Sequence, residues 1–218
     1  MPDFLDEFES IPGGSLGIIA MHGCEELGSK IDGYLVKWRA QRENEHKGTI
    51  AFAGYQRDTY LINAVCPRFG TGEAKGVIRQ SVRGYDIYII SDVFNQGCTY
   101  KMYGKEVPMS PDDHYQDLKR IIAAIGGKAR RITVMMPMLY ESRQHKRSAR
   151  ESLDCALALQ ELVSMGVENI ITFDAHDARV QNSIPLSGFE NVQPTYQMIK
   201  ALYNTIPDLK IDSEHMMI

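Results

Sequence analysis

Short apolar runs alternate with stretches of helical periodicity along the 218-residue chain. The runs are rich in isoleucine and valine, which is typical of buried strands. They lie at residues 16–21, 49–53, 60–65, 85–91, 132–136 and 169–173. Regular alternation of strands and helices predicts an α/β fold, with a mainly parallel sheet that is flanked by helices.

Three stretches between the runs repeat apolar residues at a spacing of three or four, as one face of a helix does. They are Leu27, Ile31, Leu35 and Trp38; then Leu118, Ile121, Ile122 and Ile125; then Cys155, Leu159, Leu162 and Val163. Ser110 and Gly126 are start and stop signals for the second helix. No helical pattern separates the apolar runs at 60–65 and 85–91, so part of the sheet can be antiparallel. Residues 92–109 have no clear period and predict a long loop or insertion.

Composition and charge narrow the class of protein. The chain has 24 basic and 28 acidic residues, hence a net charge of -4 and no overall attraction to nucleic acid. Its four cysteines are widely separated with no C-x-x-C pair, which favours neither a zinc site nor a disulfide framework. The acidic start MPDFLDEFES is unlike a secretion signal, and no apolar stretch approaches about 18 residues. These features predict a cytoplasmic protein without a membrane partner.

A basic cluster follows the run at 132–136, with Arg143, His145, Lys146, Arg147 and Arg150 inside eight positions. That run, a helix from about 150 to 165 and the run at 169–173 form a β-α-β unit, whose parallel strands end at one edge of the sheet. Ligands of open parallel sheets bind outside this edge. The basic loop leaves the first strand there, and the segment Asp-Ala-His-Asp at 174–177 leaves the second.

This pairing of cations and acids suggests a polyphosphate with its metal. Guanidinium groups bind phosphate oxygens in pairs, and carboxylates can hold Mg²⁺ directly or through water. A helix that starts near Arg150 would add its N-terminal dipole. The alternatives stay open at this point: the cations can form a solvated surface loop, and Asp174 can be a helix cap. Neither a Walker pattern nor a G-x-G-x-x-G after a strand occurs.

Three blocks together resemble ribose-phosphate pyrophosphokinase, also called phosphoribosyl pyrophosphate synthetase. They are SVRGYDIYII (81–90), RRITVMMPMLYESRQHKR (130–147) and NIITFDAHDARVQNSIP (169–185), in family order and with about the family's spacing. LGIIAMHGCEELGSKI (16–31) looks like the opening strand and helix of the family, and RFGTGE (68–73) lies in the place of its F-x-D-G-E segment. The resemblance runs from about residue 14 to the end.

The resemblance implies a phosphoribosyltransferase-like domain and transfer of the β,γ-diphosphoryl group of Mg-ATP to the C1 hydroxyl of ribose 5-phosphate, for nucleotide biosynthesis. It also implies a homo-oligomer, commonly a hexamer, with Mg²⁺ as cofactor and ATP and ribose 5-phosphate as partners. The residues expected to bind ATP are Arg143, Gln144, Lys146 and Arg147, together with Phe69, Thr71 and Glu73 on a segment that reaches a neighbouring subunit's nucleotide. The expected metal-side residues are His176, which the resemblance implies, and Asp174 and Asp177, whose carboxylates suit Mg²⁺.

Several positions depart from the family pattern. Thr71 stands where the family has Asp, Glu141 replaces an aromatic residue, and His145 replaces an acid. The catalytic lysine loop, the pyrophosphate loop and the loop that grips ribose 5-phosphate have no counterpart in the 218 residues. We therefore expect an N-terminal extension (1–13), an ATP-side domain (14–210) and the start of a second domain (211–218), with no catalytic residue in this half and no activity of this chain alone.

A non-catalytic associated or regulatory subunit of such an enzyme is the alternative, since it would keep the ATP loop and lack the substrate loop. A nucleic-acid binder is disfavoured, because no aromatic residues are interleaved with the cations and the net charge is negative.

Overall fold

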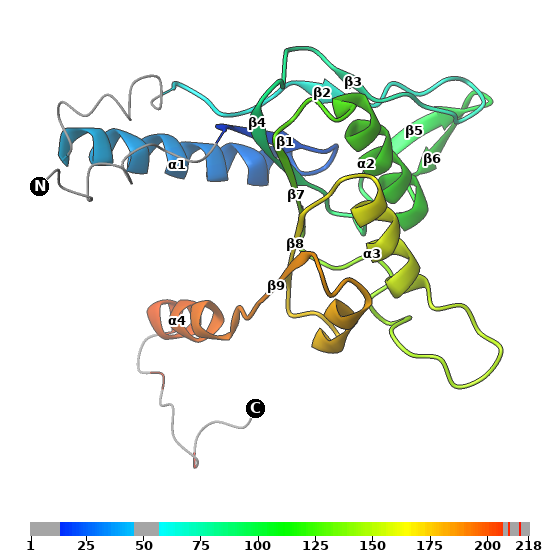
Figure 1. Cartoon of the computed structure of the whole chain (residues 1–218). Helices are drawn as coiled ribbons and strands as arrows, with labels where there is room; N and C mark the ends of the chain where they lie inside the picture. The colour runs from blue at the N-terminus through cyan, green and yellow to red at the C-terminus, as the bar shows by residue number, and fades with distance from the viewer. Residues whose placement is uncertain (1–13, 46–56, 207–208, 210–213, 215–218) are drawn as a thin grey trace, which may run out of the picture.

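The computed structural model describes residues 14–45, 57–206, 209 and 214. Within them, one sheet of five parallel strands forms the centre of the molecule (Figure 1). The strand order is β1-β4-β7-β8-β9. Their bounds are Ser15–Ala20 (β1), Tyr85–Ile90 (β4), Arg131–Met136 (β7), Asn169–Phe173 (β8) and Gly188–Val192 (β9). The predicted α/β class with a mainly parallel sheet is confirmed.

Helices cover both faces of this sheet (Figure 1). Helix α1 (Glu25–Glu45) packs on one face through a small cluster that includes Ile31 and Leu35. Helices α2 (Pro111–Ile125) and α3 (Asp154–Ser164) lie on the other face. Helix α4 (Thr195–Thr205) follows β9, stands apart from the sheet and has no buried residue.

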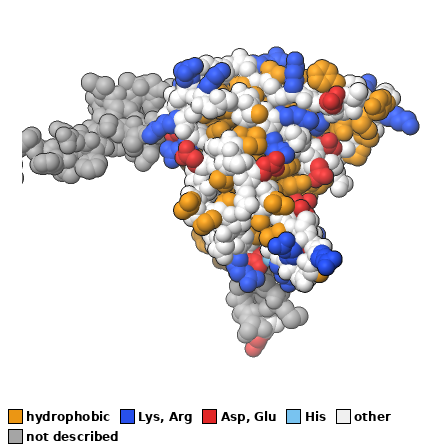
Figure 2. Space-filling model, turned by 45° about the vertical axis from the view of Figure 1, so that its right-hand side comes forward, with side chains coloured by type: hydrophobic (Ala, Val, Ile, Leu, Met, Phe, Trp, Pro, Cys, Tyr) orange, Lys and Arg blue, Asp and Glu red, His pale blue; other side chains and the backbone are white. Residues whose placement is uncertain are grey.

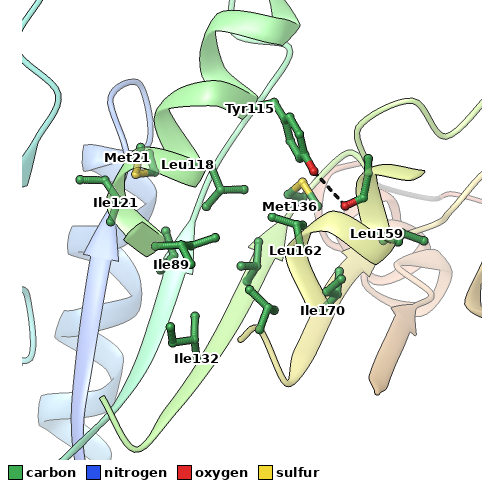
Figure 3. Close-up of a cluster of buried hydrophobic side chains, with 14 of the residues drawn as sticks. Met21, Ile89, Tyr115, Leu118, Ile121, Ile132, Met136, Leu159, Leu162 and Ile170 are labelled. Carbon is green, nitrogen blue, oxygen red and sulfur yellow. Dashed lines mark hydrogen bonds between the residues drawn. The ribbon is translucent and has the colours of Figure 1, made fainter. Parts of the chain in front are cut away.

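The main core fills the space between the sheet and helices α2 and α3 (Figure 3). Leu118 from α2 and Leu162 from α3 are fully buried against sheet residues such as Ile89 and Ile170. The Tyr115 hydroxyl, which is also buried, donates a hydrogen bond of 2.8 Å to the carbonyl of Ala158 and so joins the two helices. This core holds β7 and β8 rigidly below the loops that follow them.

Both signals at the ends of α2 act as the sequence predicts. The Ser110 side chain accepts from the backbone N–H of Asp113, whose carboxylate accepts from the Ser110 backbone, forming a capping box. Gly126 ends the helix in the left-handed conformation at φ 58°, which glycine adopts without a steric cost. The helix therefore has the expected boundaries.

The structure corrects several expected elements. In the region 60–65 only Ala64–Val65 is a strand (β2), paired antiparallel with Val77–Ile78 (β3), while Leu61 bridges to β1. The expected loop 92–109 contains a hairpin of β5 (Thr99–Met102) and β6 (Lys105–Pro108). Strand β9 and helix α4 were not predicted.

Helix α3 begins at Asp154 and not near Arg150. The prediction that the N-terminal dipole of this helix lies at Arg150 is therefore wrong. Local hydrogen bonds precede the helix, from the Ser148 backbone to Glu151 and from the Ser152 hydroxyl to Asp154. Such bonds compete with helical ones. The expected strand at 49–53 and the segments 1–13 and 216–218 lie outside the described residues.

Candidate functional site

A cavity of about 650 Å³ opens where the loops after β4, β7 and β8 meet. Strands β7 and β8 run parallel in register, with Met136 opposite Thr172, so the two chains leave the sheet at the same edge. The cavity is lined by Phe94, Pro111, Met138, Leu139, Tyr140, Glu141, Ser142, Arg143, Gln144, Phe173, Asp174, Ala175 and His176. The prediction that Arg143 and His176 leave one edge is confirmed.

The loop after β7 brings Arg143 and Gln144 to this cavity. It is anchored by buried Leu139, and its turns are closed by backbone bonds from Ser142 to Leu139 and from Gln144 to Glu141. Arg143 and Gln144 are themselves exposed. Basic side chains gather at the lower end of the described surface in Figure 2, where the loops after β7 and β8 lie in Figure 1. Of these basic residues, Arg143 lines the cavity.

The loop after β8 brings Asp174 and His176 to the same cavity. Asp174 is held at φ 47° while its backbone N–H donates to Val192, and the next N–H, that of Ala175, donates to the Asn191 side chain. The His176 backbone N–H donates to the Ser142 hydroxyl at 3.1 Å, which ties the two loops together. The side chains of Asp174 and His176 are exposed.

Asp177 takes part in a different cluster. Its carboxylate accepts hydrogen bonds from the Arg179 guanidinium and lies 3.4 Å from His145 Nε2. The hydrogen bonds from the Arg179 side chain and backbone, with the charges of Arg179 and His145, lower the pKa of Asp177, so this carboxyl is ionised at neutral pH. Its interactions leave it less available to a metal than Asp174 is.

The fit of the site to Mg²⁺ follows from these positions. Among the described residues, no three His, Cys, Asp or Glu side chains are placed to hold one metal ion. Mg²⁺ at phosphate sites uses one or two carboxylates plus oxygens of the substrate and water. The exposed carboxylate of Asp174, which lines the cavity, meets that need. The roles of Asp174, His176 and Asp177 at the metal remain predictions.

Four features of the site were not predicted from the sequence. The rings of His145 and His176 pack edge to face at 5.1 Å. Phe94, Tyr140 and Phe173 add aromatic walls to the cavity. The Tyr140 hydroxyl donates to Asp112 at 2.6 Å. Burial, with the nearby charges of Asp154 and Asp112, raises the pKa of Glu141. These groups come from separate loops, so spacing in the sequence gives no sign that they meet.

The remaining predicted residues lie outside this cavity. Lys146 and Arg147 are exposed in the basic loop and do not line it. Phe69, Thr71 and Glu73 belong to a turn between β2 and β3, and they do not line it either. Their roles in ATP binding stay predictions.

Comparisons with known proteins give a consistent result. Residues 16–166 match the family described as the N-terminal domain of ribose phosphate pyrophosphokinase. Ribose-phosphate pyrophosphokinase B of Dictyostelium discoideum is 27% identical over 137 residues, which are 62% of this chain and 36% of that protein. Ribose-phosphate pyrophosphokinase 1 of Schizosaccharomyces pombe is 33% identical over 116 residues, which are 52% of this chain and 25% of that protein.

A solved structure shares the fold. The crystal structure of phosphoribosylpyrophosphate synthetase from Mycobacterium smegmatis superposes on this chain with a TM-score of 0.60 at 18% sequence identity. The superposed part is 88% of this chain and 52% of the Mycobacterium smegmatis chain. The fold is thus of the phosphoribosyltransferase type. The chain spans about a quarter to a third of the length of these two curated relatives. In the part of the chain that the structure describes, none of the helices is both long and apolar enough to span a membrane.

Proposed function

Because the chain belongs to the family of N-terminal domains of ribose phosphate pyrophosphokinase, we propose that it supplies the ATP side of a ribose-phosphate diphosphokinase. That enzyme transfers the diphosphoryl group of Mg-ATP to the C1 hydroxyl of ribose 5-phosphate and releases AMP. The proposed ATP-side domain is 14–210, in a cytoplasmic homo-oligomer. Phe69, Thr71 and Glu73 of one copy would reach the nucleotide of another.

One observation carries this proposal: a single cavity is lined by Arg143 and Gln144 from the loop after β7 and by Asp174 and His176 from the loop after β8. A guanidinium and an amide can donate to phosphate oxygens, while a carboxylate can hold the metal that those oxygens also bind. Cations and acids within one site suit a polyphosphate that arrives with Mg²⁺.

The chemistry expected of these residues is positioning and charge neutralisation. Phosphoryl transfer needs little covalent help from the protein, so groups that hold the nucleotide in line and offset its charge supply most of the effect. Arg143 would hold phosphate oxygens, with Lys146 and Arg147 adding to the local positive potential. Asp174 and His176 would hold Mg²⁺ on the ATP, and the bound ion would further neutralise the phosphate charge.

Arg143→Ala is expected to weaken Mg-ATP binding by about 1.5–3 kcal/mol, the range for a hydrogen bond that involves a charged group. The penalty should shrink as salt is raised, because screening weakens the interaction that is lost. Calorimetric titration of the 218-residue chain with Mg-ATP at two ionic strengths measures both effects.

Arg150→Ala is the matched control, because this exposed arginine lies in the same basic loop but does not line the cavity. It should change the affinity far less than Arg143→Ala. Equal affinity of the Arg143 variant and the wild type, or equal losses in the two variants, would contradict a specific role for Arg143.

A non-catalytic associated subunit is the second candidate. It is favoured by Glu141, since this carboxylate stands in the cavity wall beside Arg143, where it disfavours the approach of phosphate. Glu141→Gln tests this observation: if the charge weakens the ATP site of a subunit that keeps the ATP loop without turnover, its removal should raise the affinity for Mg-ATP, whereas a functional ATP site should bind Mg-ATP already with Glu141 in place.

A further inference from the structure

The β5–β6 hairpin packs under the turn that carries Phe69. We call residues 68–74 the Phe69 turn. Its ends are joined by an antiparallel bridge between Arg68 and Ala74 and by a backbone bond of 2.7 Å from Phe69 to Glu73. The hairpin was not predicted from the sequence, and it is separate from the main sheet. Its contacts with the Phe69 turn therefore suggest what it does.

Two carbonyl groups of the turn accept hydrogen bonds, one from the hairpin and one from the first residue of the turn itself. The backbone N–H of Tyr103, at the tip of the hairpin, donates to Gly70 O at 2.8 Å. The Arg68 guanidinium donates to Gly72 O at 3.1 Å. These two bonds and the bridge between Arg68 and Ala74 hold the turn in the observed conformation, because opening the turn would break them together.

The side chain of Arg68 links the turn, the hairpin and helix α2. Its guanidinium lies 4.5 Å from the centre of the Tyr100 ring and donates to the Asp117 carboxylate at 2.9 Å. The same carboxylate accepts from Arg120 at 2.6 Å. The Arg68 side chain is only 10% exposed, so it is committed to these partners and is not free to bind a phosphate.

Gly72 shows how closely the hairpin fits the turn. It lies at φ 93°, in the region that side chains rarely adopt. A Cβ added there would lie 3.0 Å from the sulfur of Met102 and 3.5 Å from the Tyr100 ring. Both of these residues belong to β5, so the strand sets the shape of the turn from beneath.

The outer side of the Phe69 turn is exposed, unlike the side that packs on the hairpin. The Phe69 ring is 52% exposed, and the Thr71 hydroxyl donates to the Glu73 carboxylate at 3.0 Å on the surface. A rigid turn that presents an exposed aromatic ring loses little conformational entropy when it binds. Pre-organisation of this kind strengthens binding without any new contact.

We propose that Arg68 and Tyr100, together with the β5–β6 hairpin, are positioning elements that hold the Phe69 turn ready to contact the nucleotide of a second copy of this chain. This inference rests on the proposed function, in which Phe69, Thr71 and Glu73 reach a neighbouring ATP site. Arg68 and Tyr100 would act through Phe69 and would not touch the nucleotide themselves.

The first test measures the order of the turn by hydrogen exchange with mass spectrometry on the 218-residue chain. Tyr100→Ala should speed exchange in the Phe69 turn roughly tenfold, because it removes the ring that packs on the Arg68 guanidinium and Gly72. Tyr100→Phe keeps that ring and should preserve the protection. Tyr103→Asn is the control, since the Tyr103 ring is 77% exposed and asparagine tolerates its backbone conformation.

The second test measures Mg-ATP affinity in a double-mutant cycle of Tyr100→Ala and Phe69→Ala. Tyr100→Ala should weaken binding in the wild type but not in the Phe69→Ala background, because its effect passes through Phe69. An equal loss in both backgrounds, or unchanged exchange in Tyr100→Ala, would overturn the inference. Absence of ATP binding by the wild-type chain would instead contradict the proposed function, while the exchange test would still report on the turn.

Discussion

Asp117→Ala is expected to lower the free energy of unfolding of the 218-residue chain by about 3–5 kcal/mol, because it leaves two partly buried guanidinium groups without their shared partner. The Asp117 side chain is 6% exposed and accepts from Arg68 at 2.9 Å and from Arg120 at 2.6 Å. Loss of one member of a buried ion pair costs far more than the pair contributes, since the remaining charges stay desolvated. Urea unfolding followed by circular dichroism measures the change.

Glu26→Ala is the control for this prediction, because Glu26 also pairs with a basic residue, Lys30 at 2.6 Å, but on the exposed surface of α1. Exposed pairs of this kind contribute little to stability, because water screens the charges. Similar losses of unfolding free energy in the two variants would show that burial does not strengthen the ion pairs of Asp117 with Arg68 and Arg120. A loss below about 1 kcal/mol in Asp117→Ala would show that Arg68 and Arg120 regain water when the carboxylate is removed.

The part of the fold that the sequence predicts well is the part that packs into the main core. Strands β7 and β8 differ from the apolar runs at 132–136 and 169–173 by at most one residue, because both strands contribute apolar residues, many of them β-branched, to the main core. Helix α2 is equally clear, since a capping box and a left-handed glycine add to its apolar stripe.

The elements that were missed lack such signals. Strand β9 has the sequence GFENV and lies at the edge of the sheet, where polar residues are tolerated. Helix α4 repeats apolar residues at helical spacing, as at Ile199, Leu202 and Tyr203, but it has no side-chain cap and no buried residue. The β5–β6 hairpin turns through Tyr103 and Gly104, both at positive φ, as a tight hairpin requires. Its sequence carries Tyr-Gly instead of the more recognisable Asn-Gly, so the turn was not expected.

The candidate site, too, is predicted from the sequence only in part. The two parallel strands of the β-α-β unit suffice to place Arg143 and His176 at one edge of the sheet, and both residues line the cavity. Strand order does not determine which neighbour each side chain contacts, so the pairing of Asp177 with Arg179 and His145 has no sign in the sequence. Choices of this kind depend on distances of a few ångströms between loops, and those distances are set by the packing of the whole domain.

The 218-residue chain by itself is expected to form no measurable AMP from Mg-ATP in the presence of ribose 5-phosphate. The cavity lined by Arg143 and His176 can account for the nucleotide, but no stretch of the sequence resembles the family's ribose 5-phosphate loop. Holding two reactants at reactive distance contributes about 7–11 kcal/mol to catalysis, and most of this is lost when one of them is not oriented. The predicted loss is therefore larger than that of any single substitution described above.

The assay follows AMP formation with and without ribose 5-phosphate, for this chain and for a protein that joins it to the second half of a relative. The joined protein should form AMP only when ribose 5-phosphate is present, and Arg143→Ala should reduce that rate, because the nucleotide would then be held less firmly in the same cavity. Ribose 5-phosphate-dependent AMP from the 218 residues alone would mean that they already orient both substrates, and a second cavity among the described residues would then have to hold the sugar phosphate. A joined protein that binds Mg-ATP but forms no AMP would favour the non-catalytic subunit, since both substrate sites would be present without turnover.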